Sequence, residues 1–355
     1  MHSKKIFGQF LILACAALVS IAHAQKLPNV MILATGGTIA GTGATSTTTV
    51  GYTAAKIGVD ALIDAVPELK KVANVKGEQV FQIASENMNN DYWLKLSKRV
   101  NMLLAQSDVD GIVITHGTDT IEETAYFLDL TVHSKKPVVI VGAMRPSTAI
   151  SADGPINLYN AVLLAGSQEA IGKGVLVTLN DQINAAREVT KTNTSTLDTF
   201  KTPELGFLGY IQGSKPFFYR QSTRKHTVDS EFDISKLDVL PQVDIVYGYA
   251  NMNPIALNAF VAAGAKGIIH AGVGDGSLNN MVAPSLTEAR KKGVVIVRAS
   301  RVGQGIVARN GEADDDKLDF VVSDTLNAQK ARILLMLALT KTSDTKEIQK
   351  IFYSY

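Results

Sequence analysis

Short apolar segments rich in valine and isoleucine recur along the chain, each bounded by glycine or by polar turns. Their apolar residues are continuous and do not alternate with polar ones, which is typical of strands buried on both faces of a sheet. The strands expected on this basis span residues 30–33, 80–83, 111–115, 138–141, 175–179, 243–247, 267–270 and 294–297.

Between these strands, apolar residues recur at helical spacing. Residues 91–105, 157–164 and 328–339 each place their apolar side chains on one face of a helix. The alternation of strands and helices predicts an α/β fold, with a mostly parallel sheet that is flanked by helices on both sides.

The segment 212–242 interrupts this alternation, because it is polar, carries two prolines and separates two α/β stretches. We therefore expect two domains joined by a linker. The expected parts are a larger N-terminal α/β catalytic domain at residues 25–220, the linker at 221–241 and a smaller C-terminal α/β domain at 242–355.

The N-terminal segment has the pattern of a secretory leader. A lysine pair precedes an apolar stretch, and Ala22 and Ala24 supply the small residues of a cleavage site. The pattern predicts a signal peptide at residues 1–24, cut after Ala24, with an apolar core too short to span a membrane. A lipoprotein signal at Cys15 is the alternative, but the preceding residues fit it poorly. Cys15 is the only cysteine, so the exported chain has no thiolate for redox or metal chemistry.

The charge of the chain is close to balanced. It carries 35 basic and 33 acidic residues, and removal of Lys4 and Lys5 with the leader leaves 33 of each sign. A net charge near zero gives no indication of nucleic acid or of a membrane surface as a partner.

The stretch ATGGTIAG, residues 34–41, directly follows the first expected strand. A phosphate-binding loop needs a lysine after its last glycine, and a dinucleotide fingerprint needs G-x-G-x-x-G; this stretch supplies neither. Residues 271–276 contain G-x-G but lack the glycine that packs the helix. The glycines instead leave Thr38 at the carboxyl end of a strand, where open α/β sheets bind their ligands.

The stretch ITHGTDTIEETAYF, residues 114–127, leads from another strand into a helix. Thr120 and Glu123 predict a capping box at the start of that helix. Thr118 and Asp119 then lie in the turn, where ordinary turn and cap chemistry also explains these residue types. His116 is expected to be structural.

ATGGTIAG and HGTDT together resemble the two signatures of the bacterial L-asparaginase family. The similarity runs over residues 27–355, through SENMNND, VGAMRPSTAISADG, VTKTNT, AGVGDGS and KARILLMLALT. With an export leader, the chain is similar to the periplasmic type II enzymes, and in particular to the glutaminase-asparaginases. The resemblance implies a two-domain asparaginase-like fold, no metal or organic cofactor, and a homotetramer built as a dimer of close dimers.

The resemblance also implies catalytic roles for single residues. Thr38 is the expected nucleophile and forms an acyl-enzyme. A threonine hydroxyl is a weak nucleophile that needs a proton acceptor within reach, and Tyr52, on the irregular loop 42–53, matches the family's tyrosine beside it. Glu312 matches the glutamate behind that tyrosine and comes from the neighbouring subunit, although by itself it reads as a solvated acidic turn.

A second constellation matches Thr118, Asp119 and Lys191. A lysine in a water-poor site loses its proton more easily and can act as a base. By itself, Lys191 reads as an ordinary exposed lysine. The resemblance implies that Thr118 positions or activates the water that releases the product acid, while the order in which the two threonines act stays open.

For substrate binding, the resemblance points to residues that hold both ends of an amino acid. Ser85 and Glu86 match the family's binding pair, Asp119 is a second partner for the α-ammonium, and the backbone at Ala143 helps to polarise the amide. Hydroxyl and N–H donors suit a carboxylate, and carboxylates suit an ammonium. Ser277 is expected to reach the site from the neighbouring subunit.

The expected substrates are L-glutamine and L-asparagine. Many asparagine-selective members have glutamine at the position of Glu86 and asparagine at that of Ser277, so this chain resembles the dual-specificity branch. A narrow asparaginase is the alternative within the enzymes. An exported amino-acid-binding protein, which binds without turnover, is the alternative from another class.

Overall fold

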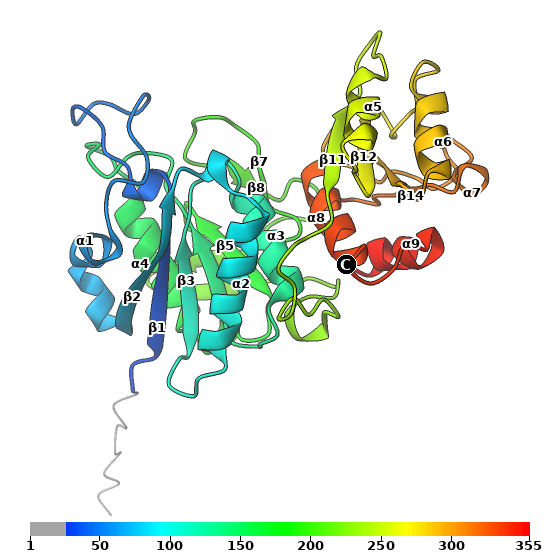
Figure 1. Ribbon diagram of the computed structural model, residues 1–355. Helices are drawn as coiled ribbons and strands as arrows, with labels where there is room; N and C mark the ends of the chain where they lie inside the picture. Colours follow the sequence, from blue (N-terminus) through cyan, green and yellow to red (C-terminus); the bar gives the residue numbers. More distant parts are fainter. Residues whose placement is uncertain (1–25) are drawn as a thin grey trace, which may run out of the picture.

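The computed structural model describes residues 26–355, which form two α/β domains (Figure 1). The predicted signal peptide, residues 1–24, and its cleavage site after Ala24 lie outside these residues. Within residues 26–355, no helix has both the length and the apolar character that a bilayer span requires.

An eight-stranded sheet forms the larger domain. Its strands are β1 (Asn29–Gly36), β2 (Asn74–Ile83), β3 (Gly111–Thr115), β4 (Val138–Val141), β5 (Val175–Leu179), β6 (Gln182–Ala185), β9 (Gly209–Gln212) and β10 (Lys215–Phe218). They lie in the order β10-β9-β6-β5-β4-β3-β1-β2. The pairs from β2 to β5 are parallel, and β6, β9 and β10 extend the sheet through antiparallel pairs. The mostly parallel sheet predicted from the sequence is confirmed.

Helices cover both faces of this sheet. They are α1 (Val59–Asp64), α2 (Asn90–Leu104), α3 (Ile121–Thr131) and α4 (Gly154–Ala165). α1 and α4 pack on one face together with Val113 of β3, whereas α2 and α3 pack on the other face together with Ile112 and Ile114. All three side chains are fully buried, and burial of each contributes about 1.5–3 kcal/mol to folding. This two-sided burial is the reason for the continuous apolar segments.

Short elements join these strands and helices. They are the 3₁₀ helices η1 (Thr38–Ala40), η2 (Pro67–Lys71), η3 (Ser85–Asn87), η4 (Gln168–Ala170) and η5 (Thr227–Asp229), and the paired strands β7 (Thr190–Lys191) and β8 (Phe200–Lys201). η1 follows β1 and η3 follows β2, so both lie at the carboxyl edge of the parallel strands.

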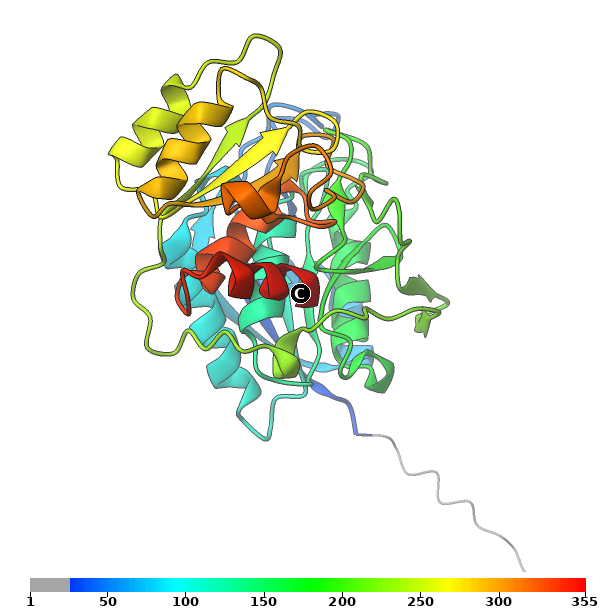
Figure 2. The ribbon, with the colours of Figure 1, turned by 90° about the vertical axis from the view of Figure 1, so that its right-hand side faces the viewer.

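The smaller domain contains a four-stranded parallel sheet. Its strands are β11 (Val243–Tyr247), β12 (Gly267–Gly272), β13 (Val295–Ser300) and β14 (Val321–Val322), and its helices are α5 (Ile255–Ala262), α6 (Ala283–Lys291), α7 (Asp315–Leu318), α8 (Ala328–Ala338) and α9 (Thr345–Ser354). α5 and α6 pack on one face of the sheet, and α8 and α9 pack on the other (Figures 1 and 2).

α8 also forms the junction between the two domains. Its apolar residues share one core with Phe127 and Leu130 of α3. Phe232, Ile234 and Leu240, from the polar connection between β10 and β11, are buried in the same core. The connection therefore follows the junction closely and is anchored there by its few apolar residues.

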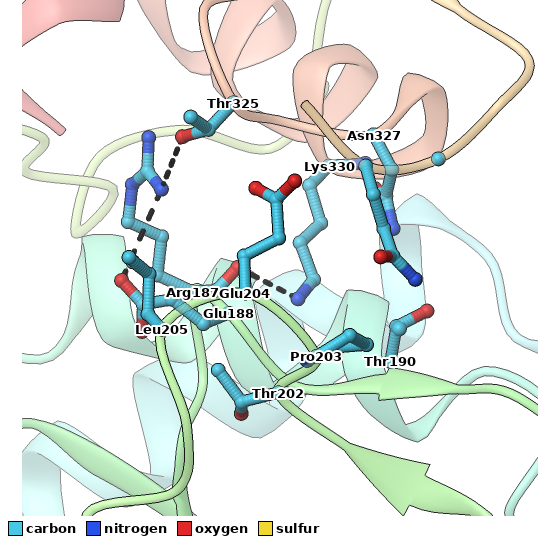
Figure 3. Close-up of a pocket in the computed structure, with 12 residues that line it drawn as sticks. Arg187, Glu188, Thr190, Thr202, Pro203, Glu204, Leu205, Thr325, Asn327 and Lys330 are labelled. Carbon is cyan, nitrogen blue, oxygen red and sulfur yellow. Dashed lines mark hydrogen bonds and ion pairs between the residues drawn. The ribbon is translucent and has the colours of Figure 1, made fainter. Parts of the chain in front are cut away.

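A small cavity lies at this junction, lined by residues that include Arg187, Glu188, Thr325 and Lys330 (Figure 3). The buried Nζ of Lys330 donates to the carbonyl of Arg187 at 2.7 Å and also to that of Val189. The cavity volume is about 50 Å³, which has room for only a few water molecules. We therefore assign the cavity to the junction and not to a substrate site.

Candidate active site

Two turns that carry threonines meet at the carboxyl edge of the large sheet. β1 and β3 are parallel neighbours with Ala34 opposite Thr115, so the segments that follow them lie side by side. Gly37 has φ +79°, and a Cβ at this position would lie 2.3 Å from the backbone of Gly117. A Cβ at Gly117 would lie 2.4 Å from Oγ of Ser85. The glycines of both motifs therefore permit close packing of backbone segments.

Thr38 is the first residue of η1 and is buried. The Thr38 hydroxyl lies 2.7 Å from the Tyr52 hydroxyl, and either oxygen can be the donor. The loop that carries Tyr52 is closed at its base, where Thr42 and Thr53 exchange backbone hydrogen bonds of 2.9 and 3.0 Å. Farther along, the amide of Gly43 donates to the Thr148 hydroxyl at 2.8 Å. These contacts hold Tyr52 over Thr38.

A second hydrogen-bonded group faces the same space. Nζ of Lys191 donates to Oγ1 of Thr118 at 3.0 Å and to Oδ1 of Asp119 at 2.6 Å. Lys191 lies on β7, whose partner β8 is joined to it through a hairpin held by Asn193 and Thr199. The lysine side chain is only 17% exposed, whereas that of Asp119 is 60% exposed. The ammonium group is therefore directed inward, onto the hydroxyl.

Ser85 joins η3 to the second turn. Its hydroxyl accepts from the amide of Asp119 at 3.2 Å, and its carbonyl accepts from the Thr120 hydroxyl at 2.8 Å. Thr120 is the N-cap residue of α3, but its side chain makes no hydrogen bond to the helix. The predicted capping box of Thr120 and Glu123 is therefore wrong, because the hydroxyl is used to hold Ser85 in place.

His116 supports the turn from below. Its ring bonds to the Gly117 carbonyl at 2.8 Å and to the Thr124 hydroxyl at 2.9 Å, and this hydroxyl also accepts from the indole of Trp93. Burial lowers the pKa of His116 to about 4, opposed in part by the bond to Gly117. The ring is therefore neutral near pH 7 and fixes the turn, as expected for a structural histidine.

One open pocket collects most of the residues singled out from the sequence. Its volume is about 790 Å³, within the range of small-molecule sites. The expected residues that line it are Thr38, Tyr52, Ser85, Glu86, Thr118, Asp119 and Lys191. Met144, Arg145, Thr194 and Ser195 also line it and had no predicted role, although they lie within or next to the quoted stretches VGAMRPSTAISADG and VTKTNT.

Three expected residues do not line this pocket. Ala143 is fully buried behind it, directly before Met144. Ser277 follows β12 and Glu312 precedes α7, so both lie in the smaller domain of the same chain, at the carboxyl edge of its sheet. Glu312 is exposed and Ser277 is half-buried. Within one chain, the pocket is formed by the larger domain.

Comparison with known families agrees with the arrangement of the two domains. Residues 29–224 match the model of the asparaginase N-terminal domain, and residues 242–352 match that of the glutaminase/asparaginase C-terminal domain. The chain belongs to the asparaginase family.

Relatives of this family member carry two kinds of name. It is 58% identical to L-asparaginase 2 of Bacillus subtilis, over 95% of this chain and 89% of the relative. It is 56% identical to the glutaminase-asparaginase of Pseudomonas fluorescens biotype A, over 93% of this chain and 91% of the relative. A solved structure, a probable cytoplasmic L-asparaginase from Campylobacter jejuni, superposes with a TM-score of 0.90 at 52% identity, covering 92% of this chain and 100% of that chain.

Proposed function

We propose that this asparaginase-family hydrolase acts on the side-chain amides of both L-glutamine and L-asparagine, through an acyl-enzyme on Thr38. The observation that carries the proposal is the pairing of two hydroxyl groups with two proton carriers around one pocket. Thr38 is paired with Tyr52, and Thr118 is paired with Lys191. A protein that only binds amino acids needs neither pair.

In the first step, Oγ1 of Thr38 attacks the amide carbon, and its proton moves to the Tyr52 oxygen as the Tyr52 hydroxyl releases its own proton toward the amide nitrogen. The amide nitrogen takes up the proton that Tyr52 passes on, the carbon–nitrogen bond breaks, ammonia departs, and an ester remains on Thr38. The 2.7 Å contact between the two hydroxyls is within the reach that proton transfer requires. Backbone N–H groups of the threonine turns are the proposed donors to the oxyanion, and the backbone at Ala143 helps to polarise the amide.

In the second step, water hydrolyses the ester. Thr118 positions this water, and the water's proton is relayed through the Thr118 hydroxyl and Nζ of Lys191, which lie 3.0 Å apart, to the Thr38 oxygen. The water oxygen adds to the ester carbon, the Thr38 oxygen leaves with a proton, and the product acid is released. The proposed steps use no metal and no organic cofactor.

The two ends of the substrate meet different parts of the pocket. Glu86 and Asp119 supply two carboxylates for the α-ammonium, and Ser85 supplies a hydroxyl at the end of the pocket where the α-carboxylate binds. These contacts are the same for both amides. Glu86 and Ser277 favour dual specificity, and the two kinds of name among the relatives agree with either a dual or a narrow preference.

We also propose that the working form is a homotetramer of close dimers, in which Ser277 and Glu312 complete the pocket of the neighbouring subunit. Neither residue lines the pocket of its own chain. Val302 and Ile306, on the smaller domain between these residues, are 62% and 65% exposed. Burial of these apolar side chains against a partner subunit would remove their surface from water.

The leader-like pattern of residues 1–24 supports export to the periplasm, although the related Campylobacter jejuni protein is named a probable cytoplasmic L-asparaginase. N-terminal sequencing of the protein from periplasmic and cytoplasmic fractions tests this directly. A periplasmic chain that begins at Gln25 is expected, and an uncut chain in the cytoplasm would contradict export.

The experiment that tests the substrate proposal is a side-by-side measurement of kcat/KM for both amides. A pocket discriminates between two substrates that differ by one methylene by only about 1–3 kcal/mol, or roughly 10- to 200-fold in kcat/KM. We expect the two values to lie within about tenfold, a difference of about 1.4 kcal/mol. The exchange of Glu86→Gln together with Ser277→Asn should lower the glutamine value more than the asparagine value. A preference for asparagine above about a hundredfold would establish the narrow asparaginase instead.

A further inference from the structure

Arg298, on β13, is fully buried in the smaller domain and uses every hydrogen-bond donor it has. An arginine side chain has five N–H donors in a fixed planar arrangement. Nε and Nη2 donate to the two carboxylate oxygens of Asp315 at 2.6 and 2.7 Å. Nη1 donates to the carbonyls of Asp275 and Gly276 at 3.0 and 3.1 Å, and Nη2 also donates to the carbonyl of Ala308 at 2.9 Å.

These acceptors belong to two separate loops. We name residues 273–277 the Ser277 loop and residues 308–314 the Glu312 loop. Arg298 restricts the motion of both loops, because its planar guanidinium group donates to backbone carbonyls of each loop at once. The loops also touch directly, since Oδ1 of Asp275 accepts from the amide of Ala308 at 2.8 Å.

Asp315 is the carboxylate partner of Arg298, and we call this pair, with the loop backbones it binds, the brace. Asp315 is fully buried, and its Oδ2 accepts from the amide of Asn310 at 2.8 Å in addition to the bond from Arg298. Asn310 has φ +58°, a left-handed conformation that turns the chain just before Glu312. The Asp315 carboxylate therefore links Arg298 directly to the backbone of the Glu312 loop.

We propose that Arg298 is a positioning residue that sets Ser277 and Glu312 at a fixed separation, so that both enter the neighbouring subunit's pocket together. The inference rests on the proposed function, in which these two residues act in the neighbour's site. Arg298 touches no substrate. It acts through the two loops, and its own chain's pocket does not depend on it.

The variants that test this are Arg298→Lys and Asp275→Ala. Lysine keeps the charge opposite Asp315, but its three donors radiate from one atom and cannot reproduce the planar fork. Asp275→Ala removes only the direct link between the loops, at a half-buried position. The matched control is Arg290→Lys, because Arg290 forms an ion pair with Asp319 in the same domain and touches neither loop.

For tetramers of Arg298→Lys alone, we expect kcat/KM for asparagine to fall by about 30-fold or more, with kcat lowered and KM raised together, because misplacement by about 1 Å can cost about 100-fold. Arg290→Lys should stay within about twofold of the unmodified enzyme, as distant surface changes do. An Arg298→Lys enzyme that also stays within about twofold overturns the inference. If Arg298→Lys does not assemble, Asp275→Ala is measured in its place, with a fall of about threefold or more expected for one lost hydrogen bond.

Mixed assemblies then separate positioning in the neighbour's site from damage to the variant's own pocket. Subunits of Arg298→Lys and Thr38→Ala, co-assembled at equal ratio, should regain activity, because about a quarter of the sites then combine an intact Thr38 with an intact brace. Glu312→Gln mixed with Thr38→Ala is the reference. Recovery in the reference but not in the Arg298→Lys mixture overturns the inference and leaves the proposed function standing. Recovery in neither shows that no subunit completes its neighbour's site, which overturns the inference and the proposed shared site but leaves amide hydrolysis through Thr38 to be tested by itself.

Discussion

At the residue scale, the proposed reactivity of Thr38 depends most directly on Tyr52. Its hydroxyl is the one side-chain hydrogen-bond partner of Thr38 in the described chain, and it comes from a loop whose own contacts fix its place. The threonine and the tyrosine are 14 residues apart, so the contact requires the loop to fold back over the strand end.

Tyr52→Phe removes only the phenolic oxygen. We expect kcat to fall by about 10²- to 10⁴-fold, the usual range for loss of one proton-transfer group, while the melting temperature stays nearly constant. Tyr159→Phe is the control, since its hydroxyl bonds to Ser214 at 3.3 Å, away from the pocket. Steady-state kinetics give the answer, and an unchanged kcat in Tyr52→Phe would remove the tyrosine from the mechanism.

Asp129 is a buried carboxyl that the chemistry does not use. Burial raises its pKa from 3.8 to about 8, partly opposed by the bond that its Oδ1 accepts from the amide of Val175; Glu188 raises the pKa further, whereas Lys330 and Arg187 lower it. Because the folded state holds this proton more tightly than the unfolded state, stability falls as pH rises from about 4 to about 8.

Asp129→Asn keeps an oxygen that can accept from Val175 but removes the titration. The variant should gain stability relative to the unmodified protein as pH rises, with little difference near pH 4 and a gain on the order of a few kcal/mol near pH 9. Thermal unfolding at the two pH values measures this. A difference in melting temperature that is independent of pH would show that Asp129 does not titrate as described.

At the scale of elements, the sequence predicted β1, β3, β4, β5, β11, β12 and β13 because they are mainly apolar. It found only residues 80–83 of β2, whose first half is polar, and it did not predict the two-residue strands β7, β8 and β14. It missed β6, β9 and β10. β9 and β10 alternate between buried or half-buried and exposed positions at the edge of the sheet, and each of the three strands has only four residues. The capping box failed for a different reason. The Thr120 hydroxyl bonds to a carbonyl 35 residues away, and no local pattern reports such a contact.

The candidate site, too, could be predicted only in part from the sequence. Thr38, Thr118 and Lys191 could be singled out because the short motifs that contain them resemble those of the asparaginase family, and the structure brings all three to one pocket. The motifs do not indicate where the smaller domain lies relative to the pocket. The positions of Ser277 and Glu312 relative to the pocket therefore became known only from the structure. Met144 and Arg145 line the pocket only because the turn after β4 folds toward it.

The hairpin of β7 and β8 is the element that presents Lys191. The Thr199 hydroxyl accepts from the amide of Asn193 at 2.8 Å and donates to its carbonyl. Thr199→Val keeps the shape and removes both bonds, so we expect kcat to fall about tenfold or more as Lys191 loses its place. Thr196→Val, at an exposed position of the same hairpin, is the control. Equal kcat values for the two variants would show that the hairpin does not position the lysine.

At the scale of the whole molecule, α8 joins the two domains through one shared core. Its residues share a core with α3 and with Trp93 of α2, the only tryptophan of the chain. We expect the fluorescence of Trp93 and the far-ultraviolet circular dichroism of the whole chain to change at the same temperature, as in a cooperative transition. Loss of the Trp93 signal well before the loss of helix and strand would show that the domains separate first.

Both domains serve one reaction in this account, and its central claim is an ester on Thr38 that Thr118 and Lys191 help to hydrolyse. The claim is tested most directly with Thr118→Val, which should acylate but deacylate slowly. This variant is mixed with asparagine, quenched with acid, digested and measured by mass spectrometry. We expect the peptide that contains Thr38 to gain the mass of one aspartyl group, and the same variant with Thr38→Val to gain none. An aspartyl group on any other residue, or full turnover by the Thr38→Val enzyme, would contradict the account.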